Sequence, residues 1–142
     1  MELIFIAHDV HAKEVTEQEF FHKGESGGTM ISSGYRKALE VIADRHHPAL
    51  WNIYAFHCSD GDNWGEDDAE AVKAALELCQ VANLFGYGEI KPRTSGSSRS
   101  SMFEAFDQIK EPNFQKLIIH QKEEVWSKFK TLLSRDRATE AA

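Results

Sequence analysis

The feature that most constrains the fold of this 142-residue chain is an apolar segment that runs directly into a polar turn and then into acidic residues. Trp51–Phe56 is rich in aromatic and β-branched residues, as expected of a buried strand. The turn that follows reads His57-Cys58-Ser59-Asp60-Gly61-Asp62-Asn63-Trp64, and the acids Glu66-Asp67-Asp68 favour the first turn of a helix. The segment therefore predicts a strand that ends near Asp60, followed by a helix that crosses over the sheet.

Further strands are predicted on both sides of this segment. Leu3–Ala7 is a continuous apolar run, which is typical of a strand that is covered on both faces, and Leu84–Ile90 and Phe114–Ile119 are also predicted as strands. Lys13–Phe21 is a weaker and more charged segment, which we expect to return antiparallel at the edge of the sheet.

Helices are predicted between the strands, because apolar residues recur there at helical spacing. Their expected starts are Ser32 or Ser33, the acids after Asp60, a capping box of Ser101 and Glu104, and Val125. Strands that alternate with helices indicate βαβ units and a mostly parallel sheet. We therefore expect one three-layer α/β domain over residues 1–135 and a disordered tail over residues 136–142.

The composition limits the classes of partner and compartment. A formal net charge of −7 argues against binding to nucleic acids or to anionic membranes, which require a basic face. Cys58 and Cys79 are expected as reduced thiols. The longest apolar run, Leu3–Ala7, is far too short to span a bilayer, and no charged-then-apolar leader precedes it. We therefore expect a cytoplasmic protein.

Two polar loops are expected at the same edge of the sheet, which is where open α/β sheets bind ligands. Thr29 opens one helix and Asp60 ends the following strand. A hydroxyl and a carboxylate are hard oxygen ligands that suit Mg²⁺ or Mn²⁺. We predict Thr29 and Asp60 as metal ligands, with accessory residues Ser59, Asp62 and Asn63. The alternative is a polar turn that caps the next helix, with Gly61 supplying an unusual backbone angle.

The histidines give weaker indications. His8 and His11 are three residues apart, but no third zinc ligand follows at a recognisable spacing, and a solvated turn explains them. His57 and Ser59 lie two apart on a strand and share a face. A nucleophile–base pair needs a third group to orient the base, and none is indicated, so we interpret His57 as a packed strand residue.

Several motifs, in fixed order, resemble the YeaH/YhbH family of bacterial proteins. They are Phe20-Phe21, Glu25-Ser26-Gly27-Gly28-Thr29, Trp51-Asn52-Ile53-Tyr54, Ser59-Asp60-Gly61-Asp62-Asn63-Trp64 and Leu84-Phe85-Gly86-Tyr87-Gly88-Glu89. Gly27-Gly28-Thr29 and Ser59-Asp60-Gly61 also resemble two of the three pieces of the metal-ion-dependent adhesion site of von Willebrand factor A (VWA) domains. The resemblance implies a VWA/Rossmann-like fold.

The first piece of that metal site, an Asp-x-Ser-x-Ser loop, does not occur in this sequence. The chain therefore resembles the carboxyl-terminal part of a family member, and the implied sheet lacks its usual first strand. We expect the two flanking strands, Leu3–Ala7 and Trp51–Phe56, to pair directly. The alternatives are association through their edges, as a homodimer or with the missing segment.

The resemblance further implies a role in bacterial stress responses and sporulation, with a PrkA-type serine kinase and a SpoVR-like protein as partners. We expect a non-enzymatic protein-interaction module. Binding of Mg²⁺ or Mn²⁺ by this chain alone is expected to be weak, because Thr29 and Asp60 supply few ligands. The alternatives are a metal-dependent hydrolase that uses Asp60 or Asp62 to activate water, and a metal-free structural scaffold.

Overall fold

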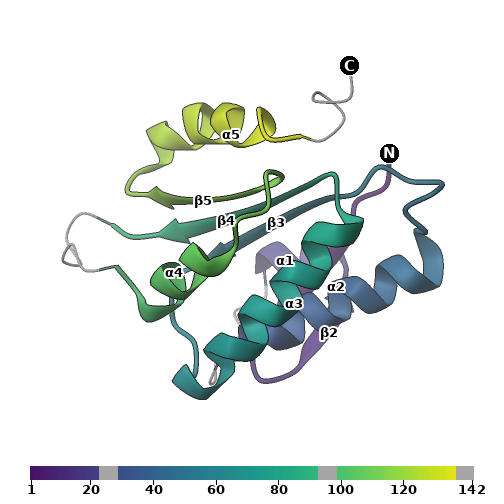
Figure 1. Cartoon of the computed structure of the whole chain (residues 1–142), viewed down its shortest axis with the longest axis horizontal. Helices are drawn as coiled ribbons and strands as arrows, with labels where there is room; N and C mark the ends of the chain where they lie inside the picture. The colour runs from purple at the N-terminus through teal and green to yellow at the C-terminus, as the bar shows by residue number, and fades with distance from the viewer. Residues whose placement is uncertain (23–28, 93–98, 137–142) are drawn as a thin grey trace.

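The computed structural model describes residues 1–22, 29–92 and 99–136, and it contains two separate sheets (Figure 1). Strands β3 (Tyr54–Ser59), β4 (Leu84–Ile90) and β5 (Phe114–Ile119) form a parallel sheet in the order β3-β4-β5. Strands β1 (Phe5–His8) and β2 (Ala12–Val15) form an antiparallel pair of their own. The fold is therefore mixed α/β, with its parallel part in the second half of the chain.

Helices lie on both faces of the parallel sheet. Their bounds are Glu17–His22 for α1, Ile31–Arg45 for α2, Asp68–Val81 for α3, Ser101–Ala105 for α4 and Val125–Leu133 for α5. Short 3-10 helices span Gly65–Asp67 (η1), Phe106–Gln108 (η3) and Lys122–Glu124 (η4). Figure 1 shows α5 over one face of the sheet and α2, α3 and α4 over the other, so β4 is covered twice. No described helix is long and apolar enough to cross a membrane.

The core lies around β4, because this strand is paired along both edges. All of its residues except Ile90 are buried, and the Phe85 and Tyr87 side chains pack with Phe106 against the helices. Gly86 faces α5, where a side chain would collide with Leu132. Asn113, also fully buried, donates to the carbonyls of Cys79 and Ala82 and ties the start of β5 to the end of α3.

Three local sequence predictions were wrong, two of them near the amino terminus. Lys13–Phe21 is not one strand, because β2 ends at Val15 and α1 follows; the Thr16 hydroxyl accepts the Glu19 amide 3.1 Å away and starts the helix. Neither Ser32 nor Ser33 is the N-cap of α2. The helix begins at Ile31, and Met30 occupies the N-cap position. In α4 the cap is Ser100, whose Oγ accepts the Phe103 amide, and not Ser101.

The expected direct pairing of Leu3–Ala7 with Trp51–Phe56 was also wrong. Within the described residues, β1 pairs with β2 and β3 pairs with β4 only. The first sheet is a local hairpin, so forming it closes a much shorter loop than pairing with β3 would. Of the expected tail, residues 137–142 lie outside the described residues, whereas the Asp136 carboxylate accepts the Tyr54 hydroxyl at 2.8 Å.

Candidate functional site

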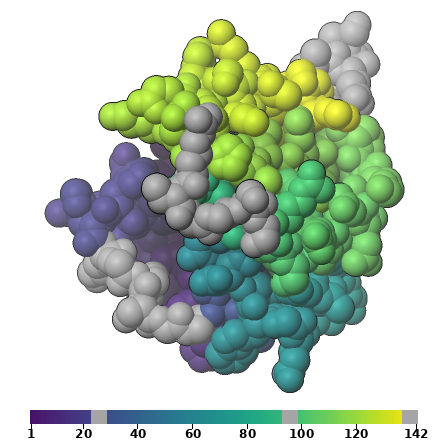
Figure 2. Space-filling view, turned by 90° about the vertical axis from the view of Figure 1, so that its left-hand side faces the viewer, coloured from purple at the N-terminus to yellow at the C-terminus, as the bar shows by residue number. Residues whose placement is uncertain are grey.

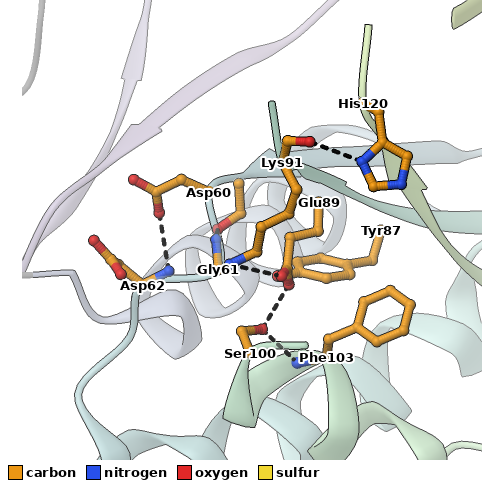
Figure 3. Close-up of polar contacts among 10 residues, drawn as sticks. Asp60, Gly61, Asp62, Tyr87, Glu89, Lys91, Ser100, Phe103 and His120 are labelled. Atoms are coloured by element: carbon orange, nitrogen blue, oxygen red, sulfur yellow. Dashed lines mark hydrogen bonds and ion pairs between the residues drawn. The ribbon is translucent and has the colours of Figure 1, made fainter. Parts of the chain in front are cut away.

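The loop after β3 forms a tight turn at the carboxyl edge of the parallel sheet (Figure 3). The Ser59 hydroxyl accepts the Gly61 amide at 3.0 Å, and an Asp60 carboxylate oxygen accepts the Asp62 amide at 2.9 Å. Asp60 and Asp62 are exposed, and their carboxylates point away from the cluster that lies beneath the turn. The predicted position of Asp60, just past a strand end, is confirmed.

Gly61 lies directly against the end of the neighbouring strand. Its φ is +93°, a region that L-residues rarely adopt. A Cβ here would lie 2.8 Å from the Glu89 carboxyl group and 2.8 Å from Cβ of Ser100. The turn therefore requires glycine both for its backbone angle and for its packing.

The cluster beneath the turn is built around Glu89, which is fully buried at the end of β4. One carboxylate oxygen, Oε2, accepts the hydroxyls of Tyr87 at 2.9 Å and Ser100 at 2.6 Å. The other, Oε1, lies 3.4 Å from Nζ of Lys91 and makes no hydrogen bond to any described residue. Burial, followed by the hydrogen bond to Glu89, raises the pKa of Tyr87, so this phenol remains a donor at neutral pH. The cluster fixes the floor of the turn.

Sequence reasoning missed this cluster. Its one local signal is an acidic residue, Glu89, near the end of an otherwise apolar strand, because a buried carboxylate needs nearby donors. The donors come from Tyr87 on the same strand and from Ser100 beyond a loop. Lys91 also accepts at its carbonyl from the His120 ring, 2.8 Å away, which links the ends of β4 and β5.

The turn is also joined to the start of α2, which is where Thr29 lies. The Thr29 carbonyl accepts the Trp64 amide at 3.1 Å. The Asn63 side chain accepts the Ile31 amide at 2.9 Å, and Asp67 accepts both the amide and the hydroxyl of Ser32. The structure thus brings together the two loops that the sequence analysis placed at one edge, through main-chain contact at Thr29.

Not all of the predicted accessory residues remain available to a ligand. The Asn63 side chain accepts the Ile31 amide and donates to the Asp68 carboxylate at 2.8 Å, so it joins the first residue of α2 to the first residue of α3. Asp60 and Asp62 are the exposed carboxylates of the turn. Among the described residues, no group of three or more His, Cys, Asp or Glu side chains is arranged to hold a metal. Gly27 and Gly28, which precede Thr29 in the predicted motif, lie outside the described residues.

Figure 2 views this edge of the sheet end-on. The teal surface of residues near 60–70 lies below the yellow-green surface of the segment that leads into α5. Asp60 and Asp62 follow β3 at this edge and are exposed, and the carboxyl edge of a parallel sheet is where ligands usually bind.

His57 belongs to a different cluster, on the face of β3 that is covered by α2. Its Nδ1 lies 2.7 Å from the Tyr35 hydroxyl, and its Nε2 lies 3.0 Å from Nε2 of His8. Burial, with a smaller effect from His8, lowers the pKa of His57 to about 3, and burial also lowers that of His8. Both ring nitrogens of His57 are occupied, so it does not activate Ser59.

The expected solvated turn at His8 was wrong. His8 is the last residue of β1, and its ring packs against Gly34 of α2, where a Cβ would come within 3.0 Å of it. A histidine at the end of an apolar strand gives no local sign of which partner will cover it. Here the partner, His57, is 49 residues away in the sequence.

Comparison with known proteins identifies a matching family and several relatives that are longer than this chain. A family sequence model described as "Protein of unknown function (DUF444)" matches residues 1–136. A UPF0229 protein of Ruminiclostridium cellulolyticum is 55% identical over 135 residues, which are 95% of this chain and 34% of that protein. A UPF0229 protein of Bacillus cereus (strain B4264) is 44% identical over 142 residues, which are 100% of this chain and 36% of that protein. No solved structure matches.

Proposed function

This chain belongs to the family of proteins of unknown function DUF444, and from that premise we propose that it is a non-enzymatic protein-binding module. The binding surface is the carboxyl edge of the parallel sheet, with Asp60 and Asp62 at its centre. The chain spans about a third of the length of the curated relatives it matches. In our proposal the module is part of a longer, cytoplasmic protein.

The observation that carries this proposal is the rigidity of an exposed acidic turn. Gly61 is packed against Glu89 and Ser100, and hydrogen bonds within the turn fix Asp60 and Asp62. Because the Asp60 carboxylate and the main chain of Asp62 are held in place before binding, less conformational entropy is lost when a partner is bound. Rigid polar groups at a strand end are a common way for α/β folds to present a binding site.

A divalent cation assists this binding in our proposal. Asp60 and Thr29 hold Mg²⁺ or Mn²⁺, with Ser59, Asp62 and Asn63 as accessory residues, and an acidic residue of the partner completes the coordination. The fit is supported by the hard oxygen donors and by the contact between the two loops. Hydrogen bonds already made by Ser59 and Asn63 leave few ligands, so the chain alone binds the cation weakly.

Calorimetric titration with MgCl₂ tests the cation. We expect binding only at millimolar concentrations for the wild type and none for Asp60→Asn, because the substitution removes the charged ligand. Asp44→Asn, which removes an exposed carboxylate from α2, is the matched control and should behave as wild type. Submicromolar affinity that Asp60→Asn abolishes would contradict the proposal, because other residues would then complete the site.

Binding to a PrkA-type serine kinase and to a SpoVR-like protein, the partners we propose in a stress and sporulation pathway, tests the interaction. Asp60→Asn and chelation of divalent cations should each weaken binding at least tenfold. Metal-dependent turnover of phosphate or ester substrates that Asp60→Asn abolishes would favour the hydrolase instead. Partner binding that neither change affects would favour a metal-free scaffold.

A further inference from the structure

A deep apolar groove lies between β1 and β3, away from the acidic turn. We call it the β1–β3 groove; its volume is about 760 Å³. Its walls are the two strands, and its floor is α2, which contributes Ala38, Val41 and Ile42. The groove is distinct from the proposed cation site, and its occupant is inferred independently of the proposed function.

The groove is covered on both faces. On β1, the ring of His8 packs against Gly34 of α2, whereas Phe5 points the other way and contacts Phe20 and Phe21 of α1. On β3, Phe56 contacts Phe129 of α5, which also lines the groove. A chain segment in the groove would therefore lie between α2 on one side and α1 and α5 on the other, with apolar surroundings above and below.

Both walls of the groove are unpaired strand edges in the described structure. β1 pairs only with β2, and β3 only with β4. The two strands also run in the same direction. Glu2, just before β1, pairs with His46 at 3.1 Å, and the His46 ring contacts Trp51, just before β3. At the other ends of the strands, His8 meets His57. Two open edges that face one groove offer main-chain donors and acceptors on both sides.

His8, which lines the groove, has a buried ring nitrogen without a hydrogen-bond partner among the described residues. Nε2 of His8 bonds Nε2 of His57, but within the described structure Nδ1 of His8 is buried and makes no hydrogen bond. His57 already shares its Nδ1 with the Tyr35 hydroxyl, so it cannot also satisfy His8. A main-chain group of a segment in the groove would provide the missing hydrogen bond, whichever ring nitrogen carries the proton.

We propose that the β1–β3 groove binds an extended apolar segment from another part of the full-length protein, as a strand hydrogen-bonded to both β1 and β3. β3 has 6 residues, so the segment is about six residues long at about 3.3 Å per residue. Its side chains are apolar on both faces, because the groove is covered on both faces. Adding it joins the two described sheets into one.

The source of the segment is inferred from the length of the relatives. The matched region is only 34% of the Ruminiclostridium cellulolyticum protein and 36% of the Bacillus cereus protein, so most of each polypeptide lies outside it. A second copy of this chain is a poor occupant. Its open edges on β1 and β3 lie within the same covered groove and cannot enter another. Its other open edges are on β2 and β5, whose charged residues Lys13, Glu14 and Lys116 do not suit an apolar groove.

Hydrogen exchange in the Ruminiclostridium cellulolyticum protein tests the proposal. In this chain alone, the amides of 5–8 and 54–59 that face the groove, and so bond neither β2 nor β4, should exchange at least tenfold faster than those of β4. In the full-length relative, the corresponding amides should exchange as slowly as β4. Equally fast exchange in the full-length relative would overturn the proposal. So would slow exchange in this chain alone, whether it is a monomer or a dimer, because the groove would then close without the segment.

A binding experiment identifies the groove as the site. The parts of that relative outside the match are produced separately and titrated into this chain, with hydrogen exchange as the readout. Ala38→Arg fills the floor of the groove, whereas Ala69→Arg places the same side chain on the exposed surface of α3. Ala38→Arg should weaken binding at least tenfold and Ala69→Arg should not. Equal binding by the two variants would overturn the proposal.

Alkylation of Cys58 gives the same test without a substitution that could disturb folding. Cys58 is exposed and lines the groove, whereas Cys79 is fully buried. A bulky maleimide on Cys58 should weaken binding of the segment at least tenfold. The bound segment should in turn slow alkylation of Cys58. Unchanged binding after alkylation, or unchanged alkylation in the complex, would contradict insertion into the groove.

Discussion

Gly61 shows how a single residue controls the carboxyl edge of the sheet. Gly61→Ala adds a Cβ at φ +93° and 2.8 Å from both Glu89 and Ser100, so either the turn or the buried cluster must shift. We expect the free energy of unfolding to fall by about 1–3 kcal/mol, measured by urea denaturation. Gly65→Ala is the control, because no described heavy atom beyond its chain neighbours lies within 4 Å of its Cβ position. Equal losses for the two variants would contradict this role of Gly61.

His57 makes stability depend on pH. Its pKa is about 3 in the folded chain and 6.5 without the fold, so below about pH 6.5 the unfolded chain takes up a proton that the folded chain does not. The free energy of unfolding is therefore not lowered by His57 above about pH 6.5, and it falls as the pH drops towards 3. At about pH 5 the loss is about 2 kcal/mol, from 1.36 kcal/mol per pKa unit.

Urea denaturation at about pH 7.5 and about pH 5 measures this effect. His57→Gln keeps a hydrogen-bonding side chain beside Tyr35 but does not titrate, so its stability should change less between the two pH values. His11→Gln, at an exposed histidine, should lose as much stability as wild type. A wild-type loss that His57→Gln leaves unchanged would assign the pH dependence to other groups.

The residues of the site differ in how far the sequence reveals them. Asp60 and Gly61 were predicted because a polar Asp-Gly pair directly follows an apolar run, a local pattern. Thr29 was placed at the same edge by the order of the elements. The roles of Asn63, Asp67 and Glu89 were not predicted, because each depends on a partner that only the tertiary fold brings close. Metal binding at Asp60 and Thr29 stays a prediction.

At the scale of elements, the N-terminus of α2 is capped by the distant segment that follows β3. Asp67, 4% exposed, accepts the Ser32 amide and hydroxyl. Asp67→Ala should lower the free energy of unfolding by about 1–2 kcal/mol, because the amide loses its acceptor in a buried place. Urea denaturation measures it. The control is Glu66→Ala, on the exposed neighbour of Asp67, and a loss as large for Glu66→Ala would show that charge alone matters.

Elements with a strong local pattern were predicted well. Leu84–Ile90 and Phe114–Ile119 match β4 and β5, and the apolar stripe of Val125–Leu133 matches α5. Lys13–Phe21 was misassigned because its charges and its phenylalanines fit a weak edge strand as well as a short helix. The overlooked sign of a helix in this segment was Thr16, because its hydroxyl can accept an amide of the first helical turn.

For the whole molecule, the alternation of strands and helices predicted helices on both faces of a parallel sheet, but not the division into two sheets. The hairpin of β1 and β2 and the parallel sheet are joined through α2 and the His8–His57 contact instead of through main-chain pairing. Periodicity indicates which residues form strands. It does not indicate which edges meet, since that depends on every segment present in the fold.

The β1–β3 groove should make this chain bind apolar dyes. Anilinonaphthalene sulfonate fluoresces when it enters a hydrophobic site of this kind, and exposed apolar patches are where such ligands bind. Phe21, 65% exposed, lines the groove, whereas Trp126, 64% exposed, lies on α5 and is not part of the lining. Phe21→Glu and Trp126→Glu remove similar apolar exposure and add the same charge, so they form a matched pair.

We expect Phe21→Glu to reduce dye fluorescence several-fold and Trp126→Glu to change it little, because only the first places a carboxylate in the groove. Far-UV circular dichroism is the control for folding, and both variants should give the wild-type spectrum. Equal reductions would mean that the dye responds to added negative charge and not to the groove. In our proposal the added strand occupies the groove of the full-length relative, so that protein should bind the dye weakly. If the dye fluoresces as brightly with the full-length relative as with this chain, the groove stays open there.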